Sequence, residues 1–455
     1  MATFANLPVE MVQSTLFHTR RKDLLTLLYV CKSLRRLTLP LLYQEIRWTS
    51  DTSSGRNPPI LLLLRSILER PKLASYVEHI EFQGSKPPSV WTNEDHPDLT
   101  ADELKLAIDV ICTSQLPSEK LWIQELENGN ADAFVALLLL QLSNLQSFAR
   151  GFDFQRDSKF VGTMLKHTLF SSPPAAVLSS FRVLQRIEYS ADMDITVHDV
   201  PSFTVDFDQI VPLFYLPSIQ SINMVMPDPD VFTWPSARPC TSTLTMLVLR
   251  FSHVKEEALE QLLSVTPSLR TLRYDFDCDV EPPNDKSCHF DGAKLSCALE
   301  HVKATIEDLA ISVHFYSIVA IEVENGSEYW GIRGNLDSLR HFQILQSLEV
   351  PLIVLLGWSS SSKVRLADVL PQQIRQLCIK DDMADFCNYE WTVRAGLDRI
   401  HDYLEDWRSH APNLECVTLT LRASGVRWGE KPQRELRTMC ERAGVACDII
   451  KQPLR

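Results

Sequence analysis

The sequence predicts a repeating α/β chain, in which a small helical domain of residues 4–48 precedes a linker of residues 49–59 and a long body of residues 60–455. Three observations support this prediction. The chain has 455 residues, 45% of them hydrophobic and 23% charged, which is enough for a large core. Apolar residues recur with helical spacing near the amino terminus. Beyond residue 60, short strand-like apolar phrases repeatedly follow helical stretches.

Composition and charge exclude several classes of partner. The formal charge of −13 argues against nucleic acid, because phosphate binding needs clustered Lys and Arg. The longest apolar runs, 134–140 and 351–357, fall short of the ~18 residues of a membrane-spanning helix. The first residues lack a signal-peptide pattern, and the eleven cysteines contain no C-x-x-C pair. We therefore expect no membrane partner, free and mostly buried thiols, and a cytoplasmic or nuclear location.

Two helices are predicted in the first 48 residues. The first starts where Asn6 is a polar cap, Pro8 stands in the first turn and Glu10 lies near the positive helix end. The second runs from about Lys22 to Arg36, and its apolar positions cover roughly 240° of the circumference, about twice what a one-sided helix needs. Such a helix must be covered on two sides, either by its own chain alone or by its own chain and a partner protein.

This first segment is basic, whereas the remainder of the chain is acidic. Residues 1–48 contain seven Lys and Arg against three Asp and Glu, a formal charge of +4. The remainder contains 38 against 55, a formal charge of −17. A basic segment attracts an acidic partner and speeds the encounter. The alternative is that the basic run 20–22 is only a solvated loop.

Three short motifs in the first segment resemble an F-box. They are Leu7-Pro8-Val9-Glu10, then Asp23-Leu24-Leu25, then Val30-Cys31-Lys32-Ser33-Leu34-Arg35-Arg36-Leu37. Residues 41–48 resemble the segment that follows the box in many members from filamentous fungi. An F-box is a small helical module that docks on the Skp-type adaptor of cullin–RING ubiquitin ligases. The resemblance covers about a tenth of the chain, and the common register of the motifs makes it specific.

The resemblance implies that the chain is the substrate-recognition subunit of a Skp–cullin–F-box ubiquitin ligase, with a protein client on its body. It also implies contact with the adaptor, and through it a cullin, at these residues: Leu7, Pro8, Leu24, Leu25, Val30, Cys31 and Arg35. Thr15 and Leu34 depart from the family, which usually has an aliphatic residue and a tryptophan there. These departures favour the alternative of a non-catalytic interaction scaffold whose F-box engages no ligase.

The body repeats one phrase, a proline followed by apolar residues in strand-like spacing, often after an amphipathic helix. Clear copies lie at 266–276, 370–379 and 411–419. Repeats of roughly 25–40 residues are typical of a leucine-rich-repeat solenoid, in which stacked units share one core. An α/β sheet with crossover helices is the competing architecture, and the lack of a glycine-rich phosphate loop argues against it. We therefore predict an irregular leucine-rich-repeat solenoid.

Residues that alternate with the buried strand residues should line the open face of the body. The residues that we expect to face a client are Arg273, Asp275, Asp277, His314 and Lys380. Asp275 and Asp277 continue into Asp279 and Glu281, a carboxylate row that suits a basic client segment or, less readily, a calcium ion. The alternative is an ordinary solvated strand face.

Motifs for catalysis are missing from the sequence. It contains neither a glycine-rich phosphate loop nor a G-x-S-x-G nucleophile motif. Three cysteines and two histidines gather in one stretch: Cys278, Cys288, His289, Cys297 and His301. Their spacing matches no common zinc site. We therefore predict a non-catalytic protein that holds neither a metal nor another cofactor.

Overall fold

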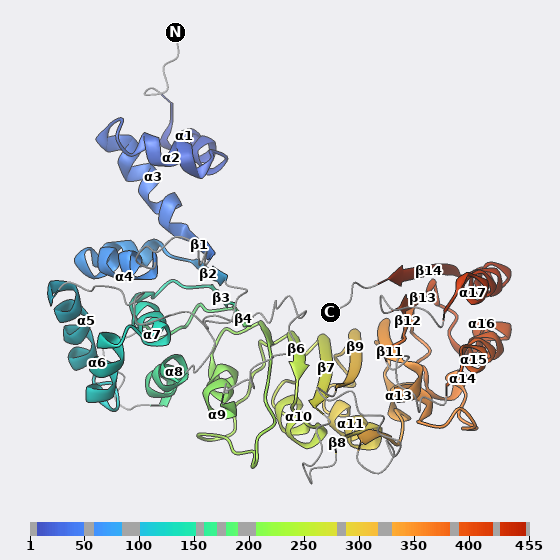
Figure 1. Ribbon diagram of the computed structural model, residues 1–455. Helices are drawn as coiled ribbons and strands as arrows, with labels where there is room; N and C mark the ends of the chain where they lie inside the picture. The colour runs from blue at the N-terminus through green and yellow to red at the C-terminus, as the bar shows by residue number, and fades with distance from the viewer. Residues whose placement is uncertain are drawn as a thin grey trace. The chain divides into compact units, whose positions relative to one another are not determined.

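The fold is taken from a computed structural model (Figure 1). It describes residues 7–49, 59–83, 101–151, 159–170, 179–189, 206–279, 288–316, 330–382, 391–421 and 428–451. The predicted linker, residues 49–59, lies outside the described residues apart from its two ends. Within the described residues, no helix has both the length and the hydrophobicity needed to cross a membrane.

The described chain forms two compact units, one ending at Ile219 and one beginning at Gln220. The elements of the first unit are α1 (Val9–Phe17), α2 (Arg21–Leu27), α3 (Lys32–Gln44), β1 (Glu45–Thr49), α4 (Pro59–Glu69), η2 (Pro71–Tyr76), β2 (His79–Gln83), α5 (Ala101–Ser114), α6 (Glu119–Glu127), α7 (Ala131–Gln141), β3 (Ser147–Arg150), α8 (Phe160–Phe170), β4 (Arg186–Tyr189), α9 (Phe207–Ile210) and η4 (Val211–Tyr215). The elements of the second unit are β5 (Ser221–Met224), β6 (Met246–Ser252), α10 (Glu256–Leu263), β7 (Thr271–Asp279), β8 (Cys288–Asp291), α11 (Gly292–Leu299), β9 (Asp308–Tyr316), β10 (Trp330–Arg333), η5 (Ser338–His341), β11 (Ser347–Pro351), α13 (Leu352–Leu356), α14 (Leu366–Val369), β12 (Gln376–Lys380), α15 (Val393–Glu405), α16 (Trp407–His410), β13 (Cys416–Leu421), α17 (Glu430–Ala443) and β14 (Ala446–Lys451).

The first three helices, residues 7–44, are called the head. The single helix predicted from Lys22 to Arg36 is wrong, because the chain forms α2, a break, and then α3. Cys31 has an extended backbone at the break, and its Sγ accepts the N–H of Leu34 at 3.4 Å, which caps the new helix. The apolar residues that were counted on one predicted helix therefore lie on α2, on α3 and in the break between them.

The head continues into the sheet of the first unit without a spacer (Figure 1). Helix α3 ends at Gln44 and β1 begins at Glu45, so residues 45–48, expected to close the helical domain, form a strand instead. The Gln44 amide donates to the Glu78 carboxylate at 2.9 Å, and the Glu78 N–H donates to the Gln44 carbonyl at 3.0 Å. These bonds fasten the end of α3 beside β2.

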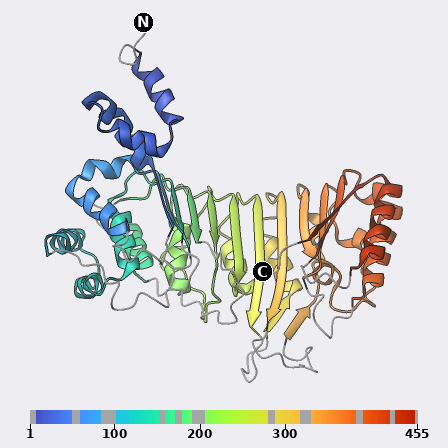
Figure 2. The same ribbon diagram turned by 45° about the horizontal axis from the view of Figure 1, so that its top comes forward.

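The strands make one twelve-stranded parallel sheet and a separate parallel pair, β8 and β10. The order of the large sheet is β1-β2-β3-β4-β5-β6-β7-β9-β11-β12-β13-β14. Figure 2 shows strands of the second unit side by side. This is an α/β fold, so the predicted leucine-rich-repeat solenoid is wrong. A helix followed by a short buried strand is common to both architectures, and the phrase could not distinguish them. The absent phosphate loop was a poor argument, since a parallel sheet needs that loop only to bind phosphate.

Burial alternates along the strands and separates two faces of the sheet. In β2, β3 and β5 every second residue is buried, and the residues between are partly exposed. Within the second unit, helices such as α10 and α15 lie along one face of the strands (Figure 1). The other strand face of that unit carries the polar residues considered next.

Candidate functional site

The head exposes large apolar side chains although it has a core of its own. That core is formed by Val12, Leu16, Leu24 and Leu42. The large apolar residues that remain between 49% and 89% exposed are Val9, Met11, Phe17, Leu25, Tyr29 and Val30. Such a concentration on α1, α2 and the break before α3 is typical of a surface that another protein covers.

The structure divides the seven predicted adaptor contacts into two groups. Leu24 lies in the core of the head, and Leu7 packs against that core. The residues with exposed side chains are Pro8, Leu25, Val30, Cys31 and Arg35. Replacing Leu24 therefore disturbs the head itself, whereas Leu25 and Val30 are open to a partner.

Four of the exposed apolar residues were not predicted as contacts: Val9, Met11, Phe17 and Tyr29. Phe17 is the last residue of α1, and Tyr29 lies in the break between α2 and α3. Tyr29 is not among the apolar positions that predicted a helix covered on two sides. The same angular pattern applied to α1 is the signal that could have found Val9, Met11 and Phe17.

Basic side chains lie in the same segment. Arg20, Lys22 and Arg35 are exposed. The Arg21 guanidinium donates to the Glu45 carbonyl at 2.8 Å, so this arginine fastens the head to the start of β1. The exposed cations thus accompany the exposed apolar residues, and together they suit an acidic partner with an apolar contact surface.

A second candidate surface is the polar strand face of the second unit, where Lys380 on β12 gathers groups from neighbouring strands. The Lys380 Nζ lies 3.2 Å from Glu349 Oε1 on β11 and 3.9 Å from an Asp382 carboxylate oxygen. It also donates to the hydroxyl of Ser312 on β9. One cation therefore contacts three groups, which come from β9, from β11 and from the residues just after β12.

Lys380 keeps its proton despite being only 5% exposed. Burial lowers the pKa of Lys380, but the carboxylates of Asp382, Glu349 and Asp275 together raise it by more, so the net pKa is above its ordinary value. The ammonium group is consequently a buried positive charge held between the carboxylates of Glu349 and Asp382.

Three of the five predicted client-facing residues have accessible side chains. Arg273 is exposed, and Asp275 and Asp277 are half-buried. His314 and Lys380 are 8% and 5% exposed, which corrects the expectation that both offer open side chains. The parallel register packs them among neighbours on adjacent strands, and Lys380 is occupied by the protein's own carboxylates.

The carboxylate row predicted at the end of β7 is described only in part. Asp275 lies opposite Ser312 and Asp277 lies opposite His314 in the β7–β9 register. Glu281 and the side chain of Asp279 lie outside the described residues. What remains is an acidic surface around Asp275, Asp277 and Glu349, which suits a basic peptide better than an anion.

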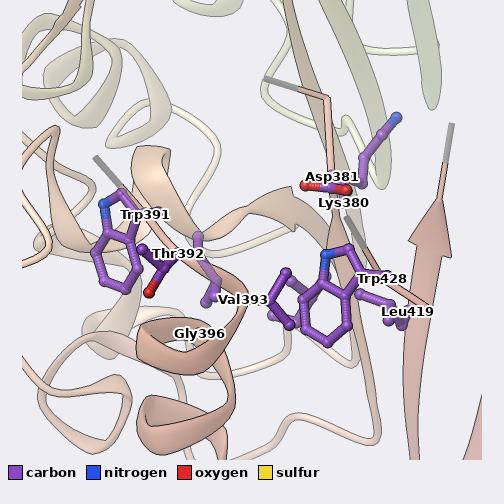
Figure 3. A pocket seen from close by; sticks show the side chains of 10 residues that line it. Lys380, Asp381, Trp391, Thr392, Val393, Gly396, Leu419 and Trp428 are labelled. Carbon is purple, nitrogen blue, oxygen red and sulfur yellow. The ribbon is translucent and has the colours of Figure 1, made fainter. Parts of the chain in front are cut away.

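A small pocket lies beside this surface, at the carboxyl end of β12 (Figure 3). Trp391 and Trp428 form part of its wall, with Thr392 at the start of α15 and Asp381 after β12. Its volume of about 20 Å³ admits one water molecule, which is far less than a substrate or a cofactor requires. The pocket therefore fits a hydration site better than a catalytic site.

The cysteines differ from the expectation of free, mostly buried thiols. Cys278 is disulfide-bonded. The free cysteines with exposed side chains are Cys31, Cys112, Cys240 and Cys297. Within the described ranges, no three His, Cys, Asp or Glu residues are grouped so that they could hold a metal ion.

Neither a comparison with protein-family models nor a comparison with curated proteins matched this chain. The functional argument therefore rests on the residues and on the two surfaces described above.

Proposed function

We propose that the protein is the substrate receptor of a Skp–cullin–F-box ubiquitin ligase. In this proposal the head binds a Skp-type adaptor, and the sheet-bearing body holds a protein client. The chain itself performs no bond chemistry. It positions the client near a ubiquitin-loaded enzyme and so raises the effective concentration of the client's lysines.

The exposed apolar side chains of the head are the observation that carries this proposal. Leu25 and Val30 belong to the motifs that resemble an F-box, and they are 49% and 62% exposed. Covering the part of such a side chain that is still exposed contributes about half of the ~1.5–3 kcal/mol for full burial. Several of them together are sufficient for stable docking once the cost of association is met.

The two departures from the F-box pattern are compatible with docking. Thr15 is exposed, and its hydroxyl donates to the Met11 carbonyl at 2.8 Å. The head therefore pays no desolvation free energy for this polar group. Leu34 is partly buried and packs against the head's own core. Both residues are therefore accommodated within the head, and Leu25 and Val30 stay exposed on its surface.

The client side of the proposal rests on the polar face of the second unit. Arg273, Asp275 and Asp277 follow one another on the exposed side of β7. The neighbouring Glu349 and Asp382 add negative charge around the single Lys380 ammonium. This face favours a client segment with basic side chains.

The adaptor contact is tested by a pull-down with purified Skp-type adaptor and cullin. The variant Leu25→Glu with Val30→Glu places charges on exposed positions without touching the head's core. We expect wild type to retain both partners in stoichiometric amounts and the double variant to lose at least tenfold in affinity, about 1.4 kcal/mol. Val231→Glu is the matched control, because Val231 is an exposed apolar residue of the second unit.

Two results would contradict the proposal. If wild type retains no adaptor, the chain is better described as an interaction scaffold outside the ligase. If Val231→Glu weakens binding as much as the double variant does, the contact does not lie on the head. Circular dichroism of each variant separates loss of binding from loss of folding.

A further inference from the structure

Two cysteines meet where α17 turns into β14 at the end of the described chain. Helix α17 ends at Ala443, and Gly444 takes the left-handed conformation with φ of +73°. The Val445 N–H then donates to the Cys440 carbonyl at 2.9 Å, and β14 begins at Ala446. This tight reversal returns the chain alongside the last turns of the helix.

The thiols of Cys440 and Cys447 face each other across this reversal. Cys440 is fully buried. On β14, Cys447 and Ile449 are partly buried whereas Ala446 and Asp448 are exposed, so Cys447 points to the covered side. Both cysteines are free, and each thiol is the largest influence on the pKa of the other.

The pair is chemically asymmetric. The hydrogen bond from Cys440 lowers the pKa of Cys447, burial opposes this, and the Arg437 cation lowers it further. The same hydrogen bond, with burial, raises the pKa of Cys440. Cys447 is therefore the thiol that ionises first, and it is also the more accessible of the two.

We propose that Cys440 and Cys447 form a reversible thiol–disulfide site that exchanges with a small disulfide such as oxidised glutathione. Cys447 is the attacking residue and Cys440 the resolving residue. The Cys447 thiolate attacks one sulfur of the glutathione disulfide, forming a mixed disulfide and releasing one glutathione thiolate. Cys440 then attacks the Cys447 sulfur, and the second glutathione leaves with the Cys440 proton. Two protein thiols lose two electrons, and one glutathione disulfide becomes two glutathione molecules.

A third thiol nearby belongs to a different face. Cys416 is on β13, where it lies opposite Ala446, and its Sγ is 3.6 Å from the Thr418 hydroxyl and 3.7 Å from an Asp448 oxygen. It therefore shares the polar side of the strands, whereas Cys447 lies opposite the buried Val417. This placement predicts a pairing of Cys447 with Cys440 and not with Cys416.

Peptide mapping of the full chain tests the site directly. Trypsin cuts after Arg437, Arg442 and Lys451, so Cys440 and Cys447 lie on separate peptides, 438–442 and 443–451. After incubation with oxidised glutathione and a non-reducing digest, we expect these two peptides to be joined. Reduction should separate them again.

The cysteine variants identify the order of reaction. Cys440→Ser should leave glutathione attached to Cys447, because no resolving thiol remains. Cys447→Ser should give neither the joined peptides nor an adduct on Cys440. Cys416→Ser should leave the joined peptides unchanged.

Three outcomes would overturn the proposal. One is a wild-type chain whose peptides 438–442 and 443–451 stay separate. Another is a disulfide between Cys447 and Cys416. The third is an adduct on Cys440 in the Cys447→Ser variant, which would show that the buried thiol reacts first.

Discussion

At the scale of single residues, Asp132 supports three elements from one buried position. Its side chain lies at the start of α7, 3.1 Å from the Arg150 guanidinium of β3, and both residues are almost fully buried. The other carboxylate oxygen accepts the N–H groups of Lys159 and Phe160 at 2.8 and 2.6 Å, at the start of α8. Arg150 in turn lies 4.0 Å from the ring centre of Tyr189 on β4.

Removing Asp132 should therefore cost more than removing an ordinary helix cap. We expect Asp132→Ala to lower the free energy of unfolding by about 3–5 kcal/mol, because it leaves the Arg150 charge buried without its carboxylate. The control is Asp206→Ala, which removes an exposed carboxylate that accepts the Asp208 N–H at 3.0 Å, at a cost of about 1 kcal/mol. Urea denaturation of both variants measures the difference, and equal losses would contradict it.

Glu256 should make the stability of the second unit depend on pH. It is 2% exposed at the start of α10, and it accepts the Asp291 N–H at 2.8 Å. Burial raises the pKa of Glu256 from 4.5 to about 7. Between these values the folded chain holds a proton that the unfolded chain has lost, so stability falls as pH rises through this window. The loss is on the order of 3 kcal/mol and is complete above pH 7.

Thermal melts between pH 4.5 and 8 measure this dependence. In Glu256→Gln the melting temperature should fall less between pH 4.5 and 8, and at pH 8 it should be higher than that of wild type. Its neighbour Glu257 is the control, because the hydrogen bond from Lys294 lowers the pKa of Glu257 and its stabilisation is present above the ordinary pKa and lost as pH falls. Glu257→Gln should therefore leave the decline in place, and a flat profile in that variant would contradict the assignment.

At the scale of elements, Gly162 allows α8 to approach α9 closely. A Cβ built at this glycine would lie 2.7 Å from the Gln209 Cα, which is backbone and cannot yield as a side chain would. Gly396 on α15 is a contrasting case, since its nearest neighbour is the Leu352 side chain at an ordinary 3.5 Å. The two helical glycines thus have different reasons to be present.

Substitution by alanine should separate these two cases. Alanine favours a helix interior by about 1 kcal/mol over glycine, so Gly396→Ala should stabilise the chain by up to that amount. Gly162→Ala should destabilise it by about 1–3 kcal/mol, because the packed helices must move apart. Denaturation midpoints measure both changes, and stabilisation by Gly162→Ala would refute the close-packing argument.

The elements also show where sequence patterns succeed. The apolar phrases at 266–276, 370–379 and 411–419 overlap β7, β12 and β13, because alternating burial leaves a clear period in the sequence. The break between α2 and α3 was missed, since a cysteine is an unusual helix cap and its neighbours are apolar. The exposed position of Tyr29 depends on that break and could not be read without it.

At the scale of the whole molecule, the arrangement of strands was the part that local patterns could not decide. Each helix and strand phrase is local, whereas the parallel pairing joins residues far apart in the sequence. Lys380 illustrates the limit: it was recognised as a residue of the open strand face, but its burial depends on Ser312 and Glu349, which come from other strands. The acidic residues along β7 were likewise visible in the sequence, whereas the approach of Glu349 and Asp382 to Lys380 was not.

Two truncated chains test whether β1 stabilises the edge of the sheet. A chain that begins at residue 45 keeps β1 beside β2, with Trp48 edge-to-face on Phe82 at 6.2 Å between ring centres. A chain that begins at residue 50 lacks β1, so Trp48 no longer covers Phe82 on β2. We expect both to melt cooperatively, with the shorter chain less stable by about 2 kcal/mol or more, because apolar surface on β2 is uncovered. Equal melting temperatures would show that β1 adds no stability.

The direct passage from α3 into β1 has a mechanical consequence. Any force applied at α1 or α2 travels through one helix into an edge strand, since Gln44 and Glu45 are consecutive. Pro40 lies inside that helix and has no N–H to donate to the preceding turn, so this position bends before the rest of α3 does. A force that pulls on the head would therefore bend α3 at Pro40 and would be transmitted to the hydrogen bonds between β1 and β2.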